Sequence, residues 1–382
     1  AATMAETLKK CGFNVIENIG GYGVAGVMKN GEGPTVLVRA DIDALPITEK
    51  TGLEYASKVR AIEQNGQEVG VMHACGHDMH MTVWAGTAQF LSHHKDLWQG
   101  TLLFIAQPAE ERGAGAAAMI EDNLFKRTAT PDYALALHVT GRLPAGDVAL
   151  CEGFALANVD SVDITIKGKG GHGSTPEVTH DPIALSARII MGLQTIVSRE
   201  ISPFDPAVVT VGSIHGGSKH NIIPSEVTLQ LTIRSYKAEV RDKILKAIER
   251  CAQNEALAAG FPSNLLPIVK LLDEYTPAAY NDPEFTKRIA KAMVKSLGEE
   301  HVHEAPPVMG GEDFGRYGPA ANCPSSIFWL GVSDPDAYKA ALLLGKKLPD
   351  IHTETFAPSP ATSIKTGVTA MTAAVLDLLP RK

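Results

Sequence analysis

The chain has 382 residues, of which 45% are hydrophobic and 20% are charged, and its formal net charge is −8. This balance is typical of globular proteins with a large core, and the length allows two or three domains. An acidic chain without a basic stripe argues against nucleic acid as a partner, and no apolar run reaches the roughly 20 residues that a membrane-spanning helix needs. The five cysteines are odd in number and widely scattered, which fits a reducing compartment, so we expect a cytoplasmic location.

Three short apolar runs in the first part of the chain end next to side chains that can bind a metal. We expect buried strands over 35–40, 101–106 and 133–137, with helices over 79–93 and 114–124 between them. The side chains that follow the strands include Asp41, Glu110 and His138. Because ligands of open parallel sheets bind just beyond the carboxyl ends of the strands, these runs predict one common site.

The pattern changes after residue 157, where the chain begins to alternate with period two, as a half-buried strand does. We expect strands over 159–166, 207–214 and 226–235, and helices over 181–198 and 238–259. This β-α-β-β-α order suits a small antiparallel sheet with two helices on one face.

The chain returns to the first domain near Tyr275, and Asp282 and Pro283 are typical of the cap and first position of a helix. The last expected elements are a helix through 297, a strand over 326–330 and a helix over 363–379. The sequence therefore predicts an α/β fold with a mixed central sheet, interrupted by an inserted α+β domain. The expected boundaries are 1–157, 158–274 and 275–382.

The segment Met72–His80 packs one thiol, three imidazoles and one carboxylate into nine residues. Thiolate and imidazole suit zinc and its neighbours among the transition metals. Cys75 and His77 are two residues apart, so a loop can fold both around one or two ions. The alternative is a buried cysteine beside a hydrogen-bonded histidine, but so many adjacent donors favour a metal site.

Glu110 and Glu111 form a carboxylate pair between a strand end and a helix. Adjacent side chains point in different directions, so one acid can bind a metal while the other serves as a general base. The alternative is a solvated helix start, favoured by the helix dipole. His138 either binds a metal or merely caps its strand, and Asp41 and Asp43 are candidates for orienting ligand imidazoles.

Three further candidates come from the second half of the chain. His172 lies in a glycine-rich loop, which is otherwise a plain turn, and Asn221 and Arg234 follow in the same inserted domain. The guanidinium fork of an arginine suits a substrate carboxylate. His352 is a lone histidine in a polar loop, and such a residue is usually at the surface.

Gly21–Gly26 matches the pattern G-x-G-x-x-G, with Asp41 downstream. A dinucleotide site needs a helix directly after this motif. The residues that follow instead predict a strand and a hairpin turn at Asn30-Gly31, so we do not expect a nucleotide site.

Taken together, these motifs resemble the M20 metallopeptidases, and most closely their amidohydrolase branch, which includes hippurate hydrolases, auxin-conjugate hydrolases and N-acyl-amino-acid deacylases. The resemblance covers nearly the whole chain. The motifs occur in the family's order and are 39–46, 73–80, Glu110-Glu111, 170–172, 221–224 and 311–314.

The resemblance implies two divalent metal ions per subunit, zinc by preference and manganese, nickel or cobalt as alternatives. The implied ligands are Cys75, His77, Glu111, His138 and His352. It implies Glu110 as general acid/base, His172 as oxyanion stabiliser that reaches into the partner subunit's site, and Asp43 as a further catalytic residue. Asn221, Arg234 and Gly311 would hold the substrate, and the inserted domain would be a ferredoxin-like lid and dimerisation domain of a homodimer.

The expected reaction is hydrolysis of an N-acyl amino acid to a carboxylic acid and a free amino acid. A carboxypeptidase or dipeptidase with the same two-metal chemistry is the first alternative. The second is a protein that binds a ligand through its metal without turning it over.

Overall fold

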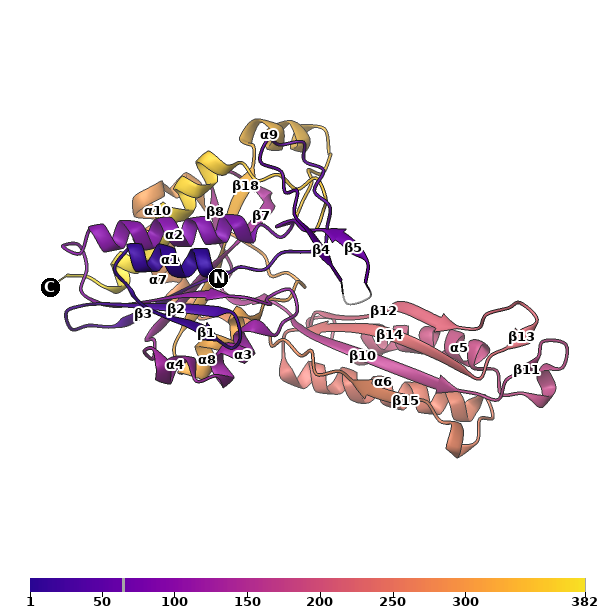
Figure 1. Cartoon of the computed structure of the whole chain (residues 1–382). Helices are drawn as coiled ribbons and strands as arrows, with labels where there is room; N and C mark the ends of the chain where they lie inside the picture. Colours follow the sequence, from indigo (N-terminus) through magenta and orange to yellow (C-terminus); the bar gives the residue numbers. More distant parts are fainter. Residues whose placement is uncertain (64–65, 382) are drawn as a thin grey trace. The chain divides into compact units, whose positions relative to one another are not determined.

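The computed structural model describes residues 1–63 and 66–381, and the chain divides into two compact units (Figure 1). The first unit comprises Ala1–Ala155, Ala279–Pro307 and Asp313–Lys382, and the inserted unit comprises Leu156–Ala278 and Val308–Glu312. Within the described part of the chain, no helix combines the length and the apolar character that crossing a bilayer requires.

A mixed eight-stranded sheet forms the centre of the first unit, which confirms the predicted α/β class. Its strands in spatial order are β1 (Asn14–Ile19), β2 (Gly23–Asn30), β6 (Gly100–Gln107), β3 (Thr35–Asp41), β7 (Tyr133–Pro144), β18 (Ser325–Ser333), β8 (Val148–Leu150) and β17 (Val302–Glu304). β6, β3, β7 and β18 run parallel, whereas β2 and β8 are antiparallel to their central neighbours. The carboxyl ends of β3, β6 and β7 therefore lie at one end of the sheet, as predicted.

Helices cover both faces of this sheet, which explains why its central strands are continuous apolar runs (Figure 1). One face shares its hydrophobic core with α1 (Ala2–Lys10), α2 (His77–His93), α7 (Pro283–Leu297) and α10 (Pro360–Leu378). The other face carries α3 (Gly115–Glu121), α4 (Leu124–Arg127) and α8 (Tyr317–Ala321). The predicted cap of α7 is confirmed, since the Asp282 carboxylate accepts a hydrogen bond from the Phe285 amide.

The remaining elements of the first unit are short. They include β4 (Arg60–Ile62), β5 (Glu68–Gly70), β9 (Gly153–Leu156), β16 (Ala279–Asn281), α9 (Pro335–Leu343) and two 3₁₀ helices, Glu299–His301 and Asp313–Arg316. β4 pairs with β5, and β9 pairs with β16.

Two local predictions were wrong. Asn30-Gly31 does not close a hairpin, because β6 lies between β2 and β3; the hairpin is instead β1–β2. The helix expected over 114–124 is two helices, α3 and α4, because Asn123 has a left-handed backbone with φ of 59°. The strand expected after Gly21–Gly26 is confirmed as part of β2, so a helix does not follow the glycine motif.

The inserted unit has the element order β-α-β-β-α-β. These elements are β10 (Asn158–Lys167), α5 (Pro182–Thr195), β12 (Ala207–Gly216), β14 (Glu226–Ser235), α6 (Ala238–Ala258) and β15 (Ile268–Leu271). The four strands form an antiparallel sheet in the order β12-β14-β10-β15, and both helices contribute to one hydrophobic core with it. A separate ribbon pairs β11 (Gly171–His172) with β13 (Ile222–Ile223).

Candidate metal centre

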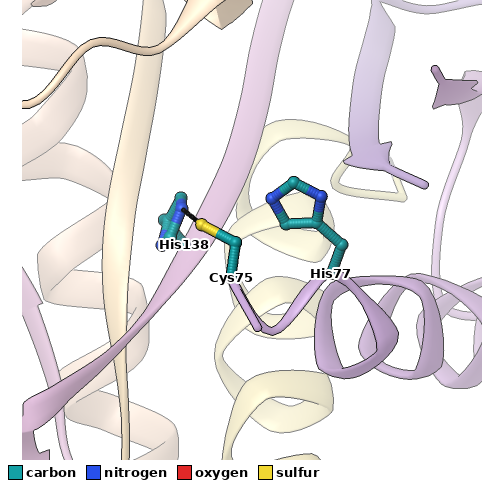
Figure 2. Close-up of side chains that lie close together, drawn as sticks. All are labelled: Cys75, His77 and His138. Atoms are coloured by element: carbon teal, nitrogen blue, oxygen red, sulfur yellow. Dashed lines mark hydrogen bonds between the residues drawn. The ribbon is translucent and has the colours of Figure 1, made fainter. Parts of the chain in front are cut away.

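A tight turn before α2 brings the predicted ligands of the first unit together. Gly76, between Cys75 and His77, has a left-handed backbone with φ of 79°, and an added Cβ would lie 2.4 Å from the Val139 side chain. A glycine is therefore needed for this turn to pack against β7, the strand that carries His138. Figure 2 shows Cys75 and His77 on the turn, with the Cys75 thiol directed at His138.

The buried thiol lies between two imidazoles. Cys75 Sγ is 3.4 Å from His138 Nε2 and 3.2 Å from His352 Nε2. His352 Nε2 is also 3.5 Å from Glu111 Oε2. The polar loop that carries His352 thus reaches the same site as the turn before α2, although 277 residues separate His352 from Cys75.

Two buried ligand atoms face each other without a hydrogen-bond partner among the described residues. His77 Nε2 and Glu111 Oε1 are both unsatisfied, and they lie 4.0 Å apart. A buried polar atom left unpaired costs about 1–3 kcal/mol, so two of them at one place require an explanation. A cation held between an imidazole nitrogen and a carboxylate oxygen satisfies both, and the donor set of nitrogen, sulfur and oxygen suits a transition metal.

The backbone fixes which nitrogen of each imidazole faces the centre. His77 Nδ1–H donates to the Asp43 carbonyl at 3.0 Å, and His138 Nδ1–H donates to the Val139 carbonyl at 2.8 Å. In both rings Nε2 is then the ligand atom. Asp43 Oδ2 accepts a hydrogen bond from the Glu111 amide at 3.0 Å, so Asp43 holds His77 through its carbonyl and Glu111 through its carboxylate. The other oxygen, Asp43 Oδ1, lies 3.2 Å from His77 Nδ1 and has no hydrogen-bond partner among the described residues.

Glu110 and Glu111 both approach His77 Nε2, at 3.9 and 4.0 Å. Their turn begins at Ala109, which has a left-handed backbone with φ of 56°, and its carbonyl accepts hydrogen bonds from two later amides. An added Cβ at Gly115 would lie 1.7 Å from the carbonyl oxygen of Pro108. This close backbone contact aims two adjacent carboxylates at one buried imidazole.

The centre is electrostatically negative. Burial and the carboxylates of Glu111 and Glu110 raise the pKa of the Cys75 thiol. Burial alone would lower the pKa of His77, but the Asp41 and Asp43 carboxylates outweigh it and raise that pKa to about 9. A field that holds protons on a thiol and an imidazole also favours a divalent cation, which would displace those protons on binding.

Comparison with known proteins assigns the chain to a family. Residues 37–342 match Peptidase family M20/M25/M40. The chain belongs to this family. It is 38% identical over 333 residues to thermostable carboxypeptidase 1 of Saccharolobus solfataricus, covering 86% of this chain and 79% of that protein.

Two further relatives bear on the reaction and on the metal. N-acetylcysteine deacetylase of Bacillus subtilis is 36% identical over 319 residues, which is 82% of this chain and 77% of that one. The crystal structure of the Bacillus subtilis YXEP protein, described as a dinuclear metal binding peptidase from the M20 family, superimposes with a TM-score of 0.77 at 27% identity. The superposition covers 99% of this chain and 91% of that chain. The chain is therefore an M20 hydrolase with a candidate metal centre.

The candidates in the inserted unit form two groups. His172 lies on β11 and Asn221 directly precedes β13, and the Gly173 amide donates to the Asn221 carbonyl at 2.9 Å. Arg234 on β14 lies next to Gly311, because a Cβ added at Gly311 would be 3.3 Å from Arg234 Nη1. The Arg234 guanidinium uses Nε to donate to Thr232 Oγ1, and among the described residues its two terminal nitrogens make no hydrogen bond.

Sequence reasoning missed the polar layer beneath the metal centre. Arg39 is completely buried, and its guanidinium donates to Gln107, Asp41 and Asp313. An arginine within an otherwise apolar strand was the available signal, because a buried charge requires a partner. His80 is the other missed residue, because its ring nitrogens contact the Asp41 carboxylate and the Val139 amide, neither of which is near it in the sequence.

Proposed function

We propose that this M20 hydrolase cleaves the amide bond of N-acyl amino acids, giving a carboxylic acid and a free amino acid. The observation that carries the proposal is the unpaired buried couple of His77 Nε2 and Glu111 Oε1 beside Glu110. A metal site with a carboxylate next to it suits hydrolysis, because the carboxylate can accept a proton from water. The relative named N-acetylcysteine deacetylase supports the substrate class.

We further propose two divalent ions per subunit, in line with the relative described as dinuclear. The residues that would hold them are Cys75, His77, Glu111, His138 and His352. Bound there, the ions would polarise the substrate carbonyl and supply a water of lowered pKa. Thiolate and imidazole favour zinc, with manganese, nickel or cobalt as alternatives. A thiol ligand must stay reduced, which supports a cytoplasmic location.

In this mechanism Glu110 takes one proton from the attacking water as the water oxygen bonds to the amide carbon. The carbon–nitrogen bond then breaks, and Glu110 returns that proton to the leaving nitrogen. We assign His172 to the negative charge that develops on the carbonyl oxygen, and Arg234, with Asn221 and Gly311, to the α-carboxylate of the amino-acid half. Asp43 keeps His77 and Glu111 in position.

We propose that the inserted unit is a lid and the dimerisation domain of a homodimer. β12 is an edge strand of ten residues that carries neither a lysine nor a proline, and much of it is exposed. Such an edge is open to pairing with another strand, and a second copy offers the same edge. Light scattering of the eluted protein tests this, and a monomeric mass would contradict it.

The decisive experiment measures hydrolysis by metal-depleted protein of N-acetyl amino acids and of free and C-terminally amidated dipeptides. Each substrate is tested with and without Zn²⁺, Mn²⁺, Ni²⁺ or Co²⁺. Metal-restored release of amino acid from the N-acetyl substrates is expected. Preference for dipeptides would instead favour the peptidase activity named in the Saccharolobus relative, and metal binding without any turnover would favour a ligand binder.

A further inference from the structure

His80 is a buried histidine whose two ring nitrogens are both occupied. It lies on the first turn of α2, three residues after His77, with 1% of its surface exposed. The Val139 amide N–H donates to His80 Nε2 at 2.9 Å. Because Nε2 accepts, the proton of the neutral ring is on Nδ1, and Nδ1–H donates to Asp41 Oδ1.

This arrangement argues that His80 does not bind a metal itself. A metal on either nitrogen would break one of the two hydrogen bonds. The carboxylate of Asp41 is also engaged by a cation, because the Arg39 guanidinium lies 2.8 Å from Asp41 Oδ2. The other oxygen, Asp41 Oδ1, accepts the hydrogen bond from His80, so both oxygens of this carboxylate already have a partner.

The two contacts of His80 join strands where their own pairing has ended. β3 and β7 are paired up to Arg39 and Ala136, and both Asp41 and Val139 lie beyond that last pair. His80 therefore ties the end of β3 to the continuation of β7. On β7 it accepts a hydrogen bond from the amide of Val139, the residue next to His138.

The backbone of Val139 connects His80 to His138. Its N–H is held by His80, and its carbonyl accepts the hydrogen bond of His138 Nδ1 at 2.8 Å. That second bond turns His138 Nε2 toward the Cys75 thiol, 3.4 Å away. The rings of His80 and His138 also meet edge to face, with centroids 4.7 Å apart.

We propose that His80 is a positioning residue, which fixes the backbone of Val139 so that His138 presents Nε2 to the metal centre. Asp41, anchored by Arg39, fixes His80 in turn. The inference rests on the proposed metal site, but it concerns how that site is shaped rather than which substrate is cleaved.

Two substitutions of His80 test its hydrogen bonds to Asp41 and to Val139 separately. The side-chain amide of His80→Asn can replace the Nδ1 donor to Asp41 but is too short to reach the Val139 amide. The longer His80→Gln can offer its oxygen near the position of Nε2 and keep the Val139 contact. His93→Asn is the matched control, because His93 is an exposed histidine on the same helix.

The readout is binding of Co²⁺ to metal-depleted protein, followed by the thiolate-to-cobalt charge-transfer band and the visible ligand-field bands. We expect His80→Asn to weaken Co²⁺ affinity about 10–100-fold and to shift the ligand-field bands, since removing outer partners of metal ligands has this effect. His80→Gln should recover most of the affinity, and His93→Asn should match the parent protein. Far-ultraviolet circular dichroism of each metal-free variant shows whether it is folded.

A His80→Asn protein with the parent's affinity and spectrum would overturn the proposal. So would equal losses in the Asn and Gln variants, which would indicate a packing role alone. Because binding is read without substrate, a parent protein that binds Co²⁺ but hydrolyses nothing refutes the proposed function and leaves this test intact. A parent protein that binds no Co²⁺ refutes the metal centre and this inference with it.

Discussion

The buried arginine beneath the metal centre allows a sharp stability prediction. Arg39 is replaced by methionine, which keeps an unbranched stem of similar length but removes the charge. In the parent protein the guanidinium donates to Asp41 Oδ2 at 2.8 Å, to Asp313 Oδ1 at 3.0 Å and to Gln107 Oε1 at 3.0 Å. Both carboxylates are fully buried, so the substitution leaves two buried acids without their shared cation.

Removing one partner from a buried ion pair costs about 3–5 kcal/mol, because the charge that remains is neither solvated nor paired. Native proteins are stable by about 5–15 kcal/mol, so Arg39→Met removes a large part of the stability of the first unit. Arg142→Met is the control. Its ion pair with Asp350 is also short, at 2.9 Å, but the Arg142 side chain is 78% exposed, and such pairs contribute about 0–1 kcal/mol.

Urea unfolding of the metal-depleted proteins, followed by tryptophan fluorescence, measures this difference. The three tryptophans, Trp84, Trp98 and Trp329, all belong to the first unit, so the signal reports the unit that contains Arg39. A loss of less than about 1 kcal/mol for Arg39→Met, equal to that of Arg142→Met, would refute the reasoning that the buried network is a charge-balanced unit.

The stability difference between the parent protein and Arg39→Met should also depend on pH. Burial raises the pKa of Asp41, but His77, His80 and Arg39 lower it more, so that pKa lies well below the ordinary 3.8. A depressed carboxylate contributes stability above its unfolded pKa and loses it as the pH falls through the folded pKa. The deficit of Arg39→Met should therefore be full above about pH 4 and shrink in stronger acid. A deficit that stays constant down to pH 2 would contradict this.

Three further predictions concern the site. Glu110→Gln should retain metal but lose about 10²–10⁴-fold in kcat, because the amide cannot accept the proton; near-parent turnover would remove Glu110 from its role. Arg234→Ala should raise KM about 10–100-fold for substrates with a free α-carboxylate and leave amidated analogues unchanged, as expected for loss of a charged hydrogen bond; equal effects on both would argue against carboxylate recognition. Gly115→Ala should lower both stability and metal affinity, because its Cβ would be 1.7 Å from the Pro108 carbonyl oxygen. Gly212→Ala is the control and should be neutral, because the nearest atom to its Cβ would be 3.8 Å away. Equal urea-unfolding midpoints for the two variants would refute the steric argument.

Local pattern was enough to predict the strands that deliver the site. The apolar runs that became β3 and β6 end within a residue of where they were expected to end, because a strand buried on both faces must stop when the chain meets charged side chains at the sheet end. The strand expected over 133–137 was placed too short, because β7 stays paired with β18 and continues to Pro144, so His138 lies within the strand. The cap at Asp282 was predictable for the same local reason. The role of Asn30-Gly31 was not predictable from local pattern. The strand before it, β2, pairs with β6, which lies 70 residues further along the chain, and not with the strand that follows.

The parts of the site that local pattern could not predict are contacts between distant segments. Arg39 meets Asp313 across 274 residues, and His352 meets Cys75 across 277. Neither pair leaves a periodicity in the sequence. The family resemblance alone placed His352 with Cys75 in one ligand set, and Arg39 and Asp313 were given no role. His80 was counted in the donor-rich segment but given no role of its own, because its two hydrogen bonds depend on residues of β3 and β7.

Hydrogen-bond satisfaction distinguishes two of the predicted ligands, His77 and Glu111, from the buried layer of Arg39 and His80. The supporting groups are paired: His80 uses both ring nitrogens, and the guanidinium of Arg39 reaches three acceptors. Within the described residues, His77 Nε2 and Glu111 Oε1 remain unpaired and lie 4.0 Å apart, and Asp43 Oδ1 beside His77 is unpaired as well. If all of these groups were merely structural, the fold would have no reason to satisfy one set and leave the adjacent set bare. The division is expected when a rigid paired layer holds a second layer ready for a cation, since a preorganised site binds its metal without first breaking internal hydrogen bonds.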